Sequence, residues 1–169
     1  MTPIDQLWRL DGRVTVVTGA ARGFGAAIAR RLVEAGAAVT VADIRPDDAR
    51  LTAERITAET GMVCDAHAVD VSDEDSVSAL FAAVESSKGP VDLLINNAGV
   101  CFRDDLTVER IGIQQEINAS APIAFAQEAA ERLRHNAHED ARTPSRGALL
   151  AISSYVTEWP EYSSDYIHH

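Results

Sequence analysis

The stretch that decides the fold is Val14-Thr15-Val16-Val17-Thr18-Gly19-Ala20-Ala21-Arg22-Gly23-Phe24-Gly25, which joins an apolar run to a glycine-rich turn. Residues 14–17 are apolar and β-branched, and they predict a short, fully buried parallel strand. The three glycines then lead into a helix-like run at residues 26–32. Glycines let a backbone approach a phosphate closely, and the free N–H groups of a helix N-terminus attract an anion. The stretch therefore predicts an anion site, although a tight strand-to-helix turn would use the same glycines.

Length and composition are those of an ordinary globular protein. The 169 residues suit a single domain spanning 1–169, and 46% of them are hydrophobic and 24% charged. A net charge of −11, from 15 basic and 26 acidic residues, disfavours a nucleic-acid partner, which needs a basic patch. No apolar run is long enough for a membrane span, and the first residues lack a signal-peptide pattern. With only Cys64 and Cys101 as thiols, we expect a cytoplasmic protein with reduced cysteines and no membrane partner.

Apolar strands and helical segments alternate along the chain. The predicted strands are residues 14–17, 38–42, 63–69, 91–95 and 147–153. The predicted helices are residues 23–34, 46–59 and 72–87, with further helical material at 107–135 and a polar surface loop at 135–146. Pro122 implies a kink or a first-turn position within 107–135. This alternation predicts an α/β fold, a Rossmann-like doubly wound parallel sheet with helices on both faces.

Ligands of such sheets bind at the carboxyl ends of the strands, where the strand order reverses. The residues at the ends of the five predicted strands are Gly19, Asp43, Asp70, Asn97 and Ser154. Asp43 places a carboxylate where it can accept both ribose hydroxyls of an adenosine and repel a 2′-phosphate, which favours NAD over NADP. A strand-end Asp can instead cap a turn, and Arg22 or Arg45 could meet a 2′-phosphate.

Three motifs follow one another along these strands. Residues 18–25 have the pattern T-G-x-x-x-G-x-G, Asp70-Val71 ends the third strand, and Asn96-Asn97-Ala98-Gly99 ends the fourth. In this order the motifs resemble those of the short-chain dehydrogenase/reductases, and the resemblance extends from residue 10 to the last residue. It implies a nicotinamide dinucleotide whose pyrophosphate lies on the glycine turn, with the ribose at Asp43 and the adenine at Asp70. The cofactor-binding residues implied are Gly19, Arg22, Gly23, Phe24, Gly25, Asp43, Asp70, Val71, Asn97, Ala98 and Gly99.

The same resemblance implies a catalytic set of Asn, Ser, Tyr and Lys. Asn118 matches the helical asparagine, and an Asn in the middle of a helix is otherwise hard to place because it competes for backbone hydrogen bonds. Ser154 matches the serine that binds the substrate oxygen, with Ser153 as the alternative because it has the family's usual offset of 13 from Tyr166. Tyr166 matches the tyrosine that exchanges a proton with that oxygen, while hydride passes between nicotinamide and a carbonyl or alcohol carbon.

The sequence departs from the family pattern at its C-terminus. The family's lysine would be residue 170, whereas the sequence ends at His169, before the family's last strands. A phenol with a pKa of about 10 is a poor base at neutral pH without that positive charge. We therefore expect a C-terminally incomplete member of the family, with an unpaired sheet edge. The alternative is a non-catalytic dinucleotide-binding or interaction module.

The remaining expectations concern partners and metals. Members of the family assemble through the helices that carry the positions of Asn118 and Tyr166, so the resemblance implies a homo-oligomer, a dimer or a tetramer. The substrate class implied is a small carbonyl or alcohol compound. We expect no metal site, because His168 and His169 are adjacent and do not share a helical face, and His135 and His138 suit a solvated helix end.

Overall fold

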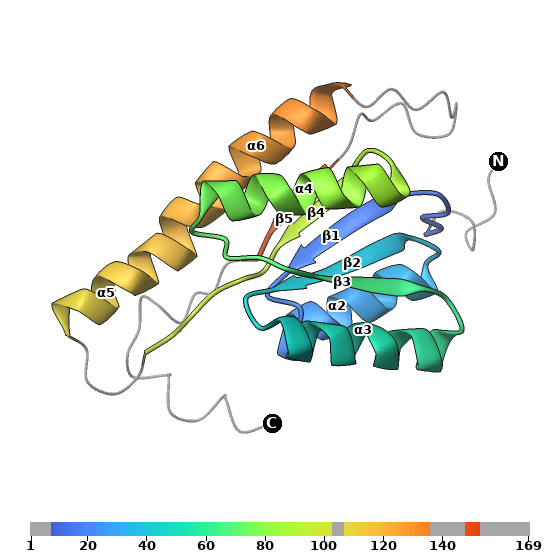
Figure 1. Ribbon diagram of the computed structural model, residues 1–169, viewed down its shortest axis with the longest axis horizontal. Helices are drawn as coiled ribbons and strands as arrows, with labels where there is room; N and C mark the ends of the chain where they lie inside the picture. The colour runs from blue at the N-terminus through green and yellow to red at the C-terminus, as the bar shows by residue number, and fades with distance from the viewer. Residues whose placement is uncertain (1–7, 103–106, 136–147, 153–169) are drawn as a thin grey trace.

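The computed structural model describes residues 8–102, 107–135 and 148–152, in which strands and helices alternate (Figure 1). The strands are β1 (Val14–Thr18), β2 (Ala38–Asp43), β3 (Cys64–Ala68), β4 (Leu93–Asn96) and β5 (Ala148–Ala151). The helices are α2 (Gly23–Glu34), α3 (Pro46–Thr60), α4 (Glu74–Lys88), α5 (Val108–Gln115) and α6 (Ala121–His135), with a π-helical segment, η1 (Glu116–Ser120), between the last two.

The described strands form one parallel sheet in the order β3-β2-β1-β4-β5. β1 is central, with Val14 in register with Ala38 of β2 and Thr15 in register with Leu93 of β4. The chain builds outward from β1 to β3 and then returns to the other side of β1 to form β4. The strand order therefore reverses between β1 and β4, next to the glycine-rich turn. This topology confirms the predicted doubly wound fold.

Helices cover both faces of the sheet, α4 and α6 on one side and α2 and α3 on the other (Figure 1). Neighbouring residues of β1 point to opposite faces, as the two-residue period of a strand requires. Val16 packs in a cluster with Phe81 of α4 and Phe125 of α6, whereas Val17 packs with Ile56 of α3. The Phe81 and Phe125 rings lie 5.4 Å apart between centroids and join α4 to α6.

Most element ends lie where the local signals predict them. Pro46 begins α3, and Asp73 caps α4 by accepting the N–H of Asp75. The third strand is shorter than the predicted 63–69, and the fourth begins two residues later than the predicted start at 91. The buried Asp92, just before β4, bonds twice to the first residue of β1, because its carboxylate accepts the N–H of Val14 and its own N–H donates to Val14 O, each at 2.8 Å. Its side chain thereby caps the beginning of β1.

The predicted helical stretch at 107–135 is helical but not uniform. Pro122 is the second residue of α6, which confirms the first-turn position, and the segment before it is π-helical, with the N–H of Ala121 donating to Glu116 O. A proline cannot donate to the preceding turn, and the wider π turn takes up that break. Asn96 Nδ2 donates to Pro122 O at 3.0 Å and ties the start of α6 to β4.

Candidate functional site

The glycine-rich loop between β1 and α2 packs against the turn that follows β4. Gly19 adopts a φ of 61°, and a Cβ at this position would lie 2.6 Å from Ala98 Cα. A Cβ on Gly25 would lie 2.5 Å from Asn97 Nδ2. Both glycines are therefore required by the protein's own packing, whatever the loop binds.

Side chains from three other elements hold this loop in place. Asp43 Oδ2 accepts the N–H of Ala21 at 3.0 Å, and Thr52 Oγ1 of α3 donates to Ala21 O at 2.6 Å. Asn97 Nδ2 donates to Gly19 O at 3.1 Å. These contacts fix the loop conformation before any ligand binds, as precise recognition requires. The sequence predicts that Asn97 lies beside a cofactor. In the structure its side-chain amide donates to the backbone of the glycine-rich loop and so holds that loop in place.

Thr18 is buried at the end of β1 and joins that strand to the turn after β4. Its Oγ1 accepts the N–H groups of Asn97 and Ala98, each at 3.1 Å, and lies 3.4 Å from Ile95 O, to which it donates. The sequence placed Thr18 in the motif but assigned it no role. Thr52 was also missed, although a threonine on the apolar face of a helix is a signal that its hydroxyl has a buried partner.

Thr18→Val should lower the free energy of unfolding by about 1 to 3 kcal/mol, because valine keeps the shape and leaves the half-buried N–H groups of Asn97 and Ala98 without their acceptor. Urea unfolding followed by circular dichroism measures the change. Thr18→Ser is the matched control, since it keeps the hydroxyl and should cost about 1 kcal/mol through the lost methyl group. Equal losses for the two variants would show that the hydroxyl bridge contributes nothing.

The outward side of the loop is open. Arg22, Gly23 and Phe24 are exposed, Phe24 at 82%. Gly23 has a φ of 59°, and a Cβ there would meet no described atom within 4 Å. Within the described residues α2 starts without a side-chain cap and without an acid in its first turn, whereas α4 has both. A pyrophosphate fits this place, because free N–H groups and the positive end of the helix dipole face accessible space.

Asp43 ends β2 beside the loop and is buried, with 6% of its surface exposed. Its Oδ1 accepts the backbone N–H of Arg45 at 3.1 Å and the Arg45 Nε at 3.4 Å. The turn-capping alternative therefore describes part of what this carboxylate does. A carboxylate offers about four acceptor sites, so capacity for further donors remains. Its role towards a ribose stays a prediction.

Asp70 and Val71 follow β3 at the same edge of the sheet as Asp43. The N–H of Val69 donates to Asp43 O at 3.0 Å, which holds the ends of the two strands together. Asp70 Oδ1 accepts the N–H and the hydroxyl of Ser72 at 2.9 and 2.6 Å. Val71 is partly buried against the core beneath α4. The structure thus brings these residues together, and their contact with an adenine stays a prediction.

Asn118 lies in η1 and bonds to the segment that follows β4. Its Nδ2 donates to Val100 O at 2.7 Å, and its Oδ1 accepts the Val100 N–H at 2.8 Å. A Cβ on Gly99 would lie 3.2 Å from the same Oδ1. The paired bonds fix the π-helical segment against the strand end. The other catalytic candidates, Ser154 with its alternative Ser153 and Tyr166, lie outside the described residues.

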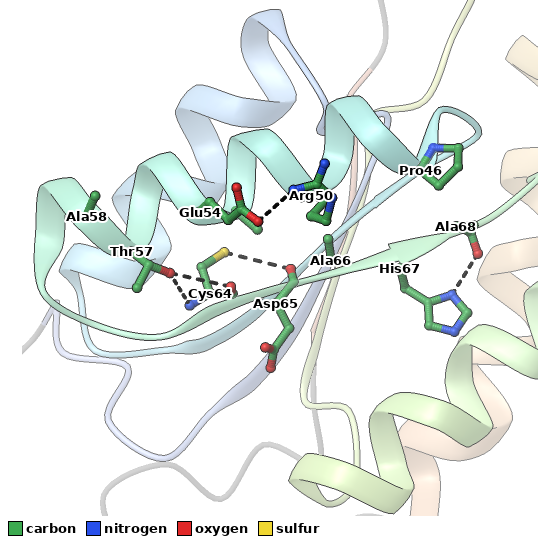
Figure 2. Close-up of a pocket in the computed structure, with 11 residues that line it drawn as sticks. Pro46, Arg50, Glu54, Thr57, Ala58, Cys64, Asp65, Ala66, His67 and Ala68 are labelled. Carbon is green, nitrogen blue, oxygen red and sulfur yellow. Dashed lines mark hydrogen bonds and ion pairs between the residues drawn. The ribbon is translucent and has the colours of Figure 1, made fainter.

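A groove of about 590 Å³ runs between α3 and the edge strand β3 (Figure 2), and none of the predicted site residues lines it. Thr57 Oγ1 accepts the N–H of Cys64 at 3.0 Å, and His67 Nδ1 lies 2.7 Å from Ala68 O. Two backbone groups of β3 are therefore in contact with side chains of the protein itself. Burial raises the pKa of Cys64 to about 11, which keeps its thiol protonated at neutral pH. Cys64 and the exposed Cys101 are both free thiols.

Residues 13–164 match the family model described as short chain dehydrogenase. The chain belongs to this family. It is similar to D-threitol dehydrogenase of Mycolicibacterium smegmatis, with 32% identity over 160 residues, covering 90% of this chain and 60% of that protein. It resembles the crystal structure of a short-chain type dehydrogenase/reductase from Mycobacterium marinum, with a TM-score of 0.83 and 25% identity, covering 94% of this chain and 62% of the other. It also resembles the structure of a 7α-hydroxysteroid dehydrogenase complexed with NADH and 7-oxo glycochenodeoxycholic acid, with a TM-score of 0.79 and 31% identity. The match covers 94% of this chain and 59% of the other.

This short-chain dehydrogenase spans 60% of the length of its threitol dehydrogenase relative, and the family assignment confirms the resemblance stated from its motifs. Across residues 8–102, 107–135 and 148–152, no helix has the length and apolar character needed to cross a membrane. The same residues contain no group of three or more His, Cys, Asp or Glu side chains that could hold a metal ion.

Proposed function

We propose that this short-chain dehydrogenase binds NAD at its glycine-rich loop and transfers hydride between the nicotinamide and a small carbonyl or alcohol substrate. The observation that carries the proposal is the accessible, uncapped N-terminus of α2 beside the buried carboxylate of Asp43. A pyrophosphate and an adenosine ribose need these two groups next to each other. The related 7α-hydroxysteroid dehydrogenase, complexed with NADH, supports the choice of cofactor.

Each group of the site would bind one part of the dinucleotide. The N–H groups at the start of α2 would hold the pyrophosphate, with Arg22 and Phe24 along its path. Asp43 would accept the ribose hydroxyls, and Asp70 would accept the adenine amino group. The positions that would line the rest of the cofactor are Val71, Asn97, Ala98 and Gly99.

A bound nicotinamide ring supplies the hydride donor or acceptor. Tyr166 would hold or release the proton at the substrate oxygen, and Ser154 would donate a hydrogen bond to the same oxygen. Asn118 would keep the segment after β4 in position through its bonds to Val100. Lowering the pKa of a phenol from about 10 to about 7 requires roughly 4 kcal/mol of differential stabilisation, so Tyr166 needs a nearby positive charge.

Asp43→Asn tests this proposal directly. The variant should narrow the preference for NADH over NADPH about tenfold, because a neutral amide binds ribose hydroxyls more weakly and no longer repels a 2′-phosphate. Asparagine retains an oxygen that can accept the Ala21 N–H, so the loop should stay folded, whereas its NH2 group cannot accept the two Arg45 donors that bond to Oδ1. Fluorescence titration with both reduced dinucleotides measures the ratio. Wild-type protein that binds neither dinucleotide at millimolar concentration would refute the proposed function.

The proposal includes a homo-oligomer that works in the cytoplasm. α5 buries none of its residues, and Val108 is 89% exposed and Ile111 44% exposed. Large apolar side chains gathered on one exposed helix favour burial against a second copy. The two free cysteines are consistent with a reducing compartment. Light scattering that gives the mass of a single chain at micromolar concentration would count against the oligomer.

A further inference from the structure

The Arg45 side chain at the end of β2 is held between two carboxylates. Its Nε lies 3.4 Å from Asp43 Oδ1, and its Nη1 lies 3.0 Å from Asp48 Oδ2. Asp43 is buried, whereas Asp48 is half-exposed on the first turn of α3. Both carboxylates thus draw the guanidinium onto the protein's own surface.

The backbone explains why Asp48 can hold Arg45 there. Arg45 is the N-cap of α3 and Pro46 occupies its first turn, so Asp48 stands three positions beyond Arg45 on the same side of the helix. An acid in the first turn of a helix is also favoured by the helix dipole. Asp48 is therefore held by the helix itself, and Arg45 lies along the first turn to reach it.

This arrangement bears on the 2′ position of the adenosine ribose. An arginine beside the ribose-binding carboxylate is the group best suited to pair with a 2′-phosphate, because a guanidinium binds phosphate through charge-assisted hydrogen bonds. Here two carboxylates, those of Asp43 and Asp48, face the single guanidinium of Arg45. The three side chains together therefore carry a net negative charge at the end of β2. A 2′-phosphate would have to displace Arg45 from Asp48 and would still meet the charge of Asp43.

We propose that Asp48 is a second determinant of cofactor choice, a positioning residue that keeps Arg45 on the protein's own carboxylates and away from a 2′-phosphate. The inference rests on the proposed function, since it concerns the same dinucleotide site. It assigns the preference for NAD to a charge arrangement of three side chains, whereas the sequence favoured NAD through Asp43 and left Arg22 and Arg45 as possible partners of a 2′-phosphate.

Asp48→Asn should strengthen NADPH binding about threefold while leaving the dissociation constant of NADH unchanged. The size follows from an exposed ion pair, for which a contribution of about 0.2 to 1 kcal/mol corresponds to roughly 1.4- to 5-fold in affinity. Titrations with 5′-AMP and adenosine 2′,5′-bisphosphate, which differ only in the 2′-phosphate, should show the same change in relative affinity. Neither compound contains the nicotinamide half of the cofactor. These binding readouts do not depend on turnover.

Asp47→Asn is the matched control. Asp47 lies on the same turn and carries the same charge, but its ion-pair partner is Arg50, at 3.9 Å. This variant should leave the NADPH to NADH ratio unchanged. In a protein that already carries Arg45→Gln, Asp48→Asn should also leave the ratio of NADPH to NADH affinity unchanged. The guanidinium that Asp48 holds is then absent, so the second substitution has nothing to release. A merely structural role for Asp48 would not depend on Arg45 in this way.

The outcomes separate the two proposals. Suppose that the wild-type chain binds NADH but that Asp48→Asn changes the ratio of NADPH to NADH affinity no more than Asp47→Asn does. The role of Asp48 is then refuted, and the proposal of NAD binding stands. A ratio that changes equally with and without Arg45 refutes it as well. If the wild-type chain binds neither dinucleotide nor either adenosine nucleotide, the proposed function fails and the role of Asp48 fails with it.

Discussion

Gly19→Ala should lower the free energy of unfolding by about 2 to 5 kcal/mol and abolish NADH binding. A left-handed conformation costs an L-residue roughly 1 to 2 kcal/mol, and Gly19 has a φ of 61°. The added Cβ would also lie 2.6 Å from Ala98 Cα, which is backbone and cannot rotate away. Forcing an extra methyl group into such packing costs about 1 to 3 kcal/mol more. A domain of ordinary stability, about 5 to 15 kcal/mol, would lose a large part of it.

Gly61→Ala is the control for the conformational part of that loss. Gly61 closes α3 with a φ of 70°, and a Cβ there would meet no described atom within 4 Å. The variant should cost about 1 kcal/mol and leave NADH binding intact. Urea unfolding and NADH titration on both variants measure the difference. If the two substitutions cost the same, the contact between the loop and the turn after β4 is looser than the structure shows.

Local sequence signals were sufficient to predict the N-terminal part of the fold. The β-branched run before Gly19 and the position of Pro46 placed β1, α2, β2 and the start of α3 within one or two residues of the observed bounds. Each signal lies within the element that it defines, so it can be recognised from neighbouring residues alone. The order of the motifs along the chain then sufficed to recognise the family.

Contacts between distant residues could not be predicted in the same way. Thr18 and Asn97 are 79 positions apart, and only the register of β1 with β4 brings the hydroxyl of one to the N–H of the other. The π-helical turn around Asn118 likewise depends on the bonds to Val100. The ion pair of Arg45 with Asp48 was within reach, since the two are three positions apart at a predicted helix start.

Phe125→Ala should lower the free energy of unfolding by about 3 to 5 kcal/mol, the usual cost of removing a buried aromatic side chain. Phe125 is 1% exposed, and its ring packs on Phe81, so the substitution leaves a cavity between α4 and α6. Ile123→Ala is the matched control on the same helix. Ile123 is 63% exposed, and its truncation should change the stability by less than about 0.5 kcal/mol.

Phe125→Ala also tests whether the glycine-rich loop is independent of the packing on the sheet face covered by α4 and α6. Phe125 belongs to the core beneath α4 and α6, whereas Ala20 and Ala21 of the loop pack in the core beneath α2 and α3. NADH at about one hundred times its Kd should therefore add about 2.7 kcal/mol to the stability of wild type and variant alike. A smaller gain for Phe125→Ala, measured by unfolding with and without NADH, would show that packing on the far face shapes the site. The turn after β4 would then be the connecting element, because Asn96 bonds to α6 and Asn97 bonds to the loop.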